Sequence, residues 1–357
     1  MVLAEYQDGY TYQEIIRQQD IWRSARPHLD RFASSASGWV DDHREYLWVF
    51  SGCGTSYYLA QTAAALFELI TGFRTRAVPS SEILINPQLV FNPHERNLLV
   101  AISRSGTTSE TLLAAQKAAG ELQVPVVSVS CDSQSPLARA GVLTPEFPFP
   151  AEQSVVMTGS FTMMLYALVH LALQSRPQSG LLELFDQVPQ ASRRVMLEHE
   201  AAVAAAAERA TELESDFCFL GQGPFFGLAN EAALKIKEMA ISTSISFHAL
   251  EYRHGPMSVV RDDTVICILL SQAGAGYELQ LARDMKNLGA RVLLFHGDSA
   301  VEANGAVGFR MPGKFGDLFN AFMYMPLLQL YGYYHARFKG INPDAPKNLS
   351  AVVMLDY

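Results

Sequence analysis

Short apolar runs alternate along this chain with longer segments that have helical spacing. In the first half, the runs EYLWVFSG (45–52), NLLVAIS (97–103) and VPVVSVS (124–130) predict strands, and residues 55–72 and 108–122 predict helices. Apolar runs without polar alternation are typical of parallel strands covered on both faces. The order strand, helix, strand therefore predicts an α/β fold with a doubly wound parallel sheet.

The second half of the chain repeats this pattern. Three pairs of segments match in the same order and at nearly constant spacing: 48–68 with 217–237, 98–106 with 266–274, and 124–132 with 290–298. A period this long indicates a duplicated domain rather than a solenoid of short repeats. We therefore predict N-terminal helices over residues 1–45, a first domain over 46–195 and a second domain over 196–357.

Composition and charge narrow the class of protein. The net charge is −9 and no cluster of Lys and Arg is present, which argues against nucleic-acid binding. The four cysteines form no CxxC pair, so neither a zinc ribbon nor a disulfide framework is indicated. The N-terminus is polar and acidic, unlike a signal peptide, and no apolar window is long enough to span a membrane. We expect a soluble cytoplasmic protein that makes no contact with membranes.

The stretch SRSGTTSET, at the end of the apolar run 97–103, is rich in hydroxyl groups. They belong to Ser103, Ser105, Thr107, Thr108, Ser109 and Thr111. Ligands of open parallel sheets bind beyond the carboxyl ends of the strands, and the N–H groups at a helix N-terminus attract anions. A phosphate monoester fits this turn. The alternative is an ordinary helix cap by Ser109 or Thr108 with Glu110, but one cap accounts for only one hydroxyl.

A second strand-to-helix junction, SGCGTSYY, contains Gly54 and Ser56. It is neither a Walker loop nor a GxGxxG motif, so a simple tight turn remains an alternative. Two such turns at adjacent strand ends could face one ligand.

The second half carries titratable groups. Glu231, Lys235 and Glu238 have the i, i+4, i+7 spacing of one helix face. Such a face is often only a salt-bridged surface. However, His254 follows in a rigid His-Gly-Pro turn, and a carboxylate with an imidazole could form a proton-transfer pair. His248, which has apolar neighbours, is the competing histidine and is interpreted as structural.

These motifs together resemble a known family. GCGTSYY, SRSGTTSET, NEAALKIKE, EYRHGP and INPDAPKNLS occur in order from about residue 45 to the end. The chain is similar to the tandem sugar isomerase (SIS) domain proteins. The similarity extends to the isomerase half of glucosamine-6-phosphate synthase and to stand-alone deaminases and deglycases of amino-linked hexose phosphates. The resemblance implies two flavodoxin-like SIS domains related by internal duplication.

The resemblance also implies binding roles in the first half. Ser103, Ser105 and Thr108 would hold the sugar phosphate, with Arg104 where the family usually has Gln. Ser56, which follows Gly54, would bind near the phosphate or a sugar hydroxyl.

In the second half, the resemblance implies catalytic roles. Glu238 would move a proton between C1 and C2 of the open-chain sugar, and Lys235 would orient Glu238 or the substrate. His254 would assist ring opening or protonate the leaving group. In the family this histidine comes from the neighbouring subunit, so a homodimer with shared active sites is expected. No metal or cofactor is expected.

Two departures from the synthase change the expected reaction. The sequence shows no glutaminase domain, so glutamine-dependent synthesis is not expected as the whole activity. Ala351 stands where the synthase has the lysine that forms a Schiff base with a ketose. A substrate that already carries nitrogen at C1 or C2 needs no such amine. We therefore expect deamination or deglycation of an amino-hexose or fructosamine 6-phosphate. Aldose–ketose isomerisation and a non-catalytic sugar-phosphate sensor remain alternatives.

Overall fold

The computed structural model describes residues 3–297 and 305–350, and these divide into two compact units. The β1–β4 unit contains Asp20–Glu152 and Gly159–Asp186, and the β5–β9 unit contains Gln153–Thr158, Gln187–Leu349 and the N-terminal segment up to Gln19. The domain boundaries expected from the sequence stay predictions.

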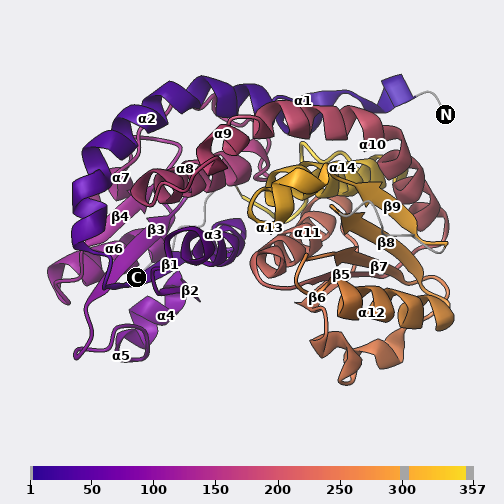
Figure 1. Cartoon of the computed structure of the whole chain (residues 1–357). Coiled ribbons are helices and arrows are strands. Elements are labelled where there is room, and N and C mark those ends of the chain that lie inside the picture. Colours follow the sequence, from indigo (N-terminus) through magenta and orange to yellow (C-terminus); the bar gives the residue numbers. More distant parts are fainter. Residues whose placement is uncertain (1–2, 298–304, 351–357) are drawn as a thin grey trace. The chain divides into compact units, whose positions relative to one another are not determined.

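In the β1–β4 unit, four parallel strands form a sheet in the order β2-β1-β3-β4 (Figure 1). The strands are β1 (Leu47–Gly52), β2 (Thr75–Pro79), β3 (Asn97–Ile102) and β4 (Val126–Val129). The helices are α2 (Gln18–Asp42), α3 (Thr55–Thr71), α4 (Ser80–Ile85), α5 (Pro87–Val90), α6 (Ser109–Gly120), α7 (Pro136–Ala140), α8 (Gly159–Ser175) and α9 (Leu181–Phe185).

Both faces of this sheet are covered, as the continuous apolar runs predict. On one face, Val49 and Leu99 pack in a buried cluster with Ala114 of α6. On the other face, Trp48 stacks on Phe67 of α3 with ring centroids 4.9 Å apart. Successive residues of one strand therefore face opposite layers, and both layers are apolar.

In the β5–β9 unit, five parallel strands form a sheet in the order β6-β5-β7-β8-β9. The strands are β5 (Phe217–Gly221), β6 (Ser244–His248), β7 (Val265–Leu269), β8 (Arg291–His296) and β9 (Val307–Arg310). The α-helices are α1 (Gly9–Ile16), α10 (Val188–Glu212), α11 (Pro224–Ala240), α12 (Ala275–Asn287), α13 (Gly316–Phe319) and α14 (Ala321–Phe338). Short 3₁₀ turns are η1 (Leu3–Tyr6), η2 (Glu251–Arg253), η3 (Pro256–Val259) and η4 (Gly313–Phe315).

The two sheets repeat one topology. In each, the first strand lies between the second and the third, so the order 2-1-3-4 recurs as 6-5-7-8. The strand order reverses between β1 and β3 and again between β5 and β7, and such switch points are where open parallel sheets bind ligands. The predicted doubly wound α/β fold and its duplication are therefore confirmed. Among the described helices, none has the length and apolar character needed to cross a membrane.

Candidate functional site

The two turns that the sequence singled out follow neighbouring strands of the β1–β4 unit. One turn follows β1 and leads into α3, and the other follows β3 and leads into α6. Because β1 and β3 pair in parallel, both turns lie at the same edge of the sheet, at its switch point. The expectation that these turns have adjacent positions is confirmed.

The hydroxyl turn, which we define as Ser103–Thr108, is held by its own side chains. Ser103 Oγ accepts the N–H of Gly106 at 3.1 Å and lies 3.1 Å from Thr108 Oγ1. Ser105 Oγ accepts the N–H of Thr107 at 3.2 Å and its hydroxyl at 2.9 Å. Gly106 has φ +64°, and an added Cβ would overlap the side chain of Ser135. The turn is thus a closely packed loop that presents hydroxyl groups before a helix N-terminus.

The helix-cap alternative does not apply to Thr108. Thr108 is the N-cap of α6, but its side chain makes no cap hydrogen bond. Thr111 is buried and belongs to another group, since its Oγ1 lies 3.2 Å from Ser80 Oγ and 3.5 Å from Cys53 Sγ. Four of the six hydroxyls therefore belong to the strand-end turn, and Thr111 belongs to a buried link between α4 and α6.

Arg104 forms an ion pair with Glu152, a carboxylate that the sequence did not indicate. Its Nη1 lies 3.0 Å from Oε2 of Glu152, and both side chains are largely buried. Glu152 also accepts the N–H of Ser160 at 2.8 Å and its hydroxyl at 2.6 Å. The guanidinium is therefore oriented by protein groups, and part of its charge is compensated before any anion binds. Glu152 follows Arg104 by 48 residues in a stretch without regular structure, so no pattern signalled it.

The first turn places Gly54 and Ser56 at the start of α3. Gly54 is the N-cap with φ +52°, and Ser56 lies in the first turn of the helix with only 5% of its surface exposed. The Ser56 N–H donates to the Cys53 carbonyl at 3.0 Å. Burial raises the pKa of the Cys53 thiol, which agrees with a packing role for that residue.

In the β5–β9 unit, the predicted acidic and basic groups lie together on α11. Glu231 and Lys235 are fully buried, and Lys235 Nζ lies 3.1 Å from Oε1 of Glu231. Lys235 also pairs with Glu238, whose side chain is 18% exposed. Burial alone would lower the pKa of Lys235, but the two carboxylates outweigh it and raise the pKa. The face is therefore a buried carboxylate–ammonium–carboxylate row, with Glu238 at its accessible end.

His254 lies in the short turn after β6, between η2 and η3, and is exposed. In the described part of the chain, no hydrogen bond or ion pair joins it to Glu238. His248 ends β6, stacks on Phe226 with centroids 3.7 Å apart, and donates a hydrogen bond from Nδ1 to Oε1 of Gln222 at 3.0 Å. Burial lowers the pKa of His248. Ala351, the residue in place of the family lysine, lies outside the described residues.

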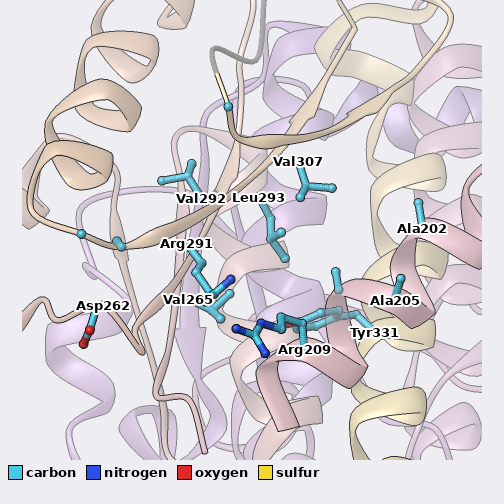
Figure 2. A pocket seen from close by; sticks show the side chains of 14 residues that line it. Ala202, Ala205, Arg209, Asp262, Val265, Arg291, Val292, Leu293, Val307 and Tyr331 are labelled. Atoms are coloured by element: carbon cyan, nitrogen blue, oxygen red, sulfur yellow. The ribbon is translucent and has the colours of Figure 1, made fainter. Parts of the chain in front are cut away.

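A cavity of about 590 Å³ lies at the opposite edge of the β5–β9 sheet (Figure 2). Val265, Arg291 and Val307 line it from the amino ends of β7, β8 and β9, and Ala202 and other residues of α10 complete it. None of the residues predicted from the sequence lines this cavity. Among the described residues, no group of His, Cys, Asp and Glu could hold a metal ion.

Comparison with known proteins gives a consistent assignment. Residues 48–173 match the SIS domain family. The chain is 27% identical over 314 residues to the glutamine–fructose-6-phosphate aminotransferase of Methanothermobacter thermautotrophicus, with 86% of this chain and 51% of that protein covered. It is 27% identical over 360 residues to a candidate D-galactosamine-6-phosphate deaminase of Streptomyces coelicolor, with 94% and 91% covered. The chain thus spans about half the length of the aminotransferases it matches.

Solved structures extend the likeness to the whole chain. A glucosamine-6-phosphate deaminase of Thermotoga maritima superposes with TM-score 0.76 at 29% identity, covering 97% of this chain and all of that one (100%). A tagatose-6-phosphate ketose/aldose isomerase of Escherichia coli has TM-score 0.84 at 22% identity, covering 98% and 97%, and this likeness concerns the fold. The matched domain, the repeated topology and these relatives together show that residues 48–173 form a SIS domain and that the chain resembles tandem SIS-domain proteins over its whole length.

Proposed function

We propose that this chain is a phosphosugar enzyme that acts on an amino-hexose or fructosamine 6-phosphate and releases ammonia or an amine. The observation that carries the proposal is the row on α11, where the buried ammonium of Lys235 pairs with the carboxylate of Glu238 at the accessible end of the row. A carboxylate held in this way is suited to carry a proton between two neighbouring carbon atoms.

The hydroxyl turn supports the binding half of the proposal. Ser103, Ser105 and Thr108 supply neutral donors, and the N-terminus of α6 adds backbone N–H groups with a partial positive charge. A phosphate ester is the ligand that suits neutral hydroxyl and N–H donors together. The switch-point position of the turn adds support.

The proposed reaction uses one proton transfer followed by hydrolysis. In the open-chain form of a 2-amino aldose, Glu238 removes the proton from C2 and returns it to C1, which leaves an imine at C2. Water then hydrolyses the imine to a ketone and ammonia. In a fructosamine the proton moves from C1 to C2, and hydrolysis of the C1 imine releases the amine. His254 is proposed to assist ring opening or to protonate the leaving nitrogen.

The experiment that tests this proposal is the substitution Glu238→Gln, which preserves the shape of the side chain and removes the base. We expect ammonia release from glucosamine 6-phosphate or galactosamine 6-phosphate, or amine release from a fructosyl-amino-acid 6-phosphate, to fall at least a hundredfold, about the contribution of a general base. Binding of the sugar phosphate, measured by calorimetry, should persist. A Glu238→Gln enzyme with the full rate would show that another group is the base.

Aldose–ketose isomerisation is the second candidate. It uses the same proton transfer without loss of nitrogen, and the fold likeness to the tagatose-6-phosphate isomerase favours it. Assays of galactosamine 6-phosphate and tagatose 6-phosphate separate the two activities, because only the first substrate can yield ammonia.

A further inference from the structure

The turn after β7, Ser271–Gly274, is the structural copy of the hydroxyl turn. Ser271 and Gly274 match Ser103 and Gly106 in the sequence repeat. In both copies the glycine N–H donates to the serine Oγ, at 3.1 Å in the first and 3.0 Å in the second. Since β5 and β7 are neighbours as β1 and β3 are, this second turn also lies at a switch point.

Unlike the hydroxyl turn, the second turn already holds an anion that belongs to the chain itself. The N–H of Gln272 lies 3.0 and 2.9 Å from the two carboxylate oxygens of Asp317, which precedes α14 in sequence. The N–H of Ala273 also donates to Asp317. Consecutive backbone N–H groups before a helix form the arrangement in which proteins bind phosphate and other anions.

A second carboxylate completes the turn from the other side. Glu278 of α12 is fully buried and accepts the Ser271 N–H at 2.8 Å and the Ser271 hydroxyl at 3.1 Å. Burial raises the pKa of Glu278 to about 7, with the charge of Asp317 contributing, and burial also raises the pKa of Asp317. Two carboxylates at the same turn therefore oppose the entry of a phosphate.

We infer that Ser271–Gly274 is a second anion-binding turn that the chain keeps closed with Asp317, so that each chain binds one phosphate ester, at the hydroxyl turn. The assignment of the phosphate ester to the hydroxyl turn rests on the proposed function, whereas the closing of the second turn by Asp317 does not.

The substitution Asp317→Ser tests this inference, because it removes the carboxylate and leaves the backbone N–H groups in place. Sulfate serves as the probe at about pH 6, where it remains a dianion and Glu278 is mostly protonated. Calorimetric titration should give one sulfate per chain for the unmodified protein and two for D317S. A crystal soaked in sulfate should place the additional ion on the N–H groups of Gln272 and Ala273.

Asp263→Ser is the matched control, since it also removes one aspartate of this unit, here one that pairs with Arg261 at the surface. It should bind one sulfate. The inference is overturned if folded D317S, and also D317S combined with Glu278→Gln, bind sulfate no more than the unmodified protein does. If the unmodified protein binds no sulfate while D317S binds one at Ser271–Gly274, the closing role of Asp317 is confirmed and the proposed role of the hydroxyl turn fails.

Discussion

At the scale of single residues, Lys235 is the most constrained group of the catalytic proposal. It has no exposed surface, and it pairs with two carboxylates of its own helix, one turn before and one turn after it. Removing one member of a buried ionic group leaves the others uncompensated, and this costs more than the group contributes as a whole.

We therefore expect Lys235→Met to lower the free energy of unfolding by about 3 to 5 kcal/mol at neutral pH. Glu231, which is fully buried, would lose its cation. Adding Glu231→Gln should restore part of this stability, because it removes the unpaired charge. Urea unfolding measures both effects.

Lys237→Met is the control, because Lys237 lies on the exposed side of the same helix. It should change the free energy of unfolding by no more than about 0.5 kcal/mol. Equal losses of unfolding free energy in K235M and K237M would contradict the assignment of Lys235 as the centre of a buried row.

At the scale of elements, the hydroxyl turn depends on one backbone conformation. Gly106 has a positive φ and no room for a side chain beside Ser135. We expect Gly106→Ala to cost at least about 1 to 3 kcal/mol from backbone strain alone and to weaken phosphate-ester binding, because the N–H of residue 106 orients Ser103. Thermal unfolding and calorimetric titration with a hexose 6-phosphate measure the two effects.

Gly120→Ala is the comparison within the same unit. Gly120 ends α6, and no atom lies within 4 Å of an added Cβ. Alanine there should be neutral or should stabilise by up to about 1 kcal/mol. If Gly106→Ala and Gly120→Ala lower the free energy of unfolding by the same amount, Gly106 does not determine the conformation of the hydroxyl turn.

Strands that are buried along their length could be predicted from sequence, including β4 at one edge of its sheet, while the edge strands β2 and β9 could not. β1 and β3 are buried along nearly their whole length and read as continuous apolar runs. β2 and β9 lie at the edges, where exposed positions such as Arg76 and Val307 interrupt the apolar pattern. β2 and β9 bury less of their surface, so their sequences retain less of the apolar pattern.

The candidate functional site could likewise be predicted only in part. The hydroxyl turn and the row on α11 are local in sequence, so their residues could be predicted together. The Glu152 partner of Arg104 and the Asp317 partner of Gln272 depend on contacts across 48 and 45 residues. Such pairs have no sequence period, because the fold alone brings them into contact.

At the scale of the whole molecule, the resemblance proposes a homodimer in which His254 serves the active site of its partner. Two inactive variants test this arrangement. Glu238→Gln and His254→Ala are unfolded together, mixed in equal amounts and refolded. If sites are shared, each mixed dimer carries one intact site, and the mixture should recover about a quarter of the unmodified activity.

If Glu238 and His254 of one chain serve the same site, every site in the mixture carries one defect. The activity then stays at the level of the separate variants, and the proposal of shared sites is wrong. Each variant refolded alone provides the baseline, and the unmodified protein treated in the same way provides the upper limit.

The cavity at the amino ends of β7, β8 and β9 has a practical consequence for inhibitor discovery. Five-residue strands such as β7 separate it from the switch-point edge by about 15 Å. A compound library docked into this cavity would be selected against a region that none of the proposed binding or catalytic residues lines. Hits from such a screen should leave the Michaelis constant for a sugar phosphate unchanged, whereas molecules chosen for hydroxyl-lined Ser103–Thr108 should compete with it.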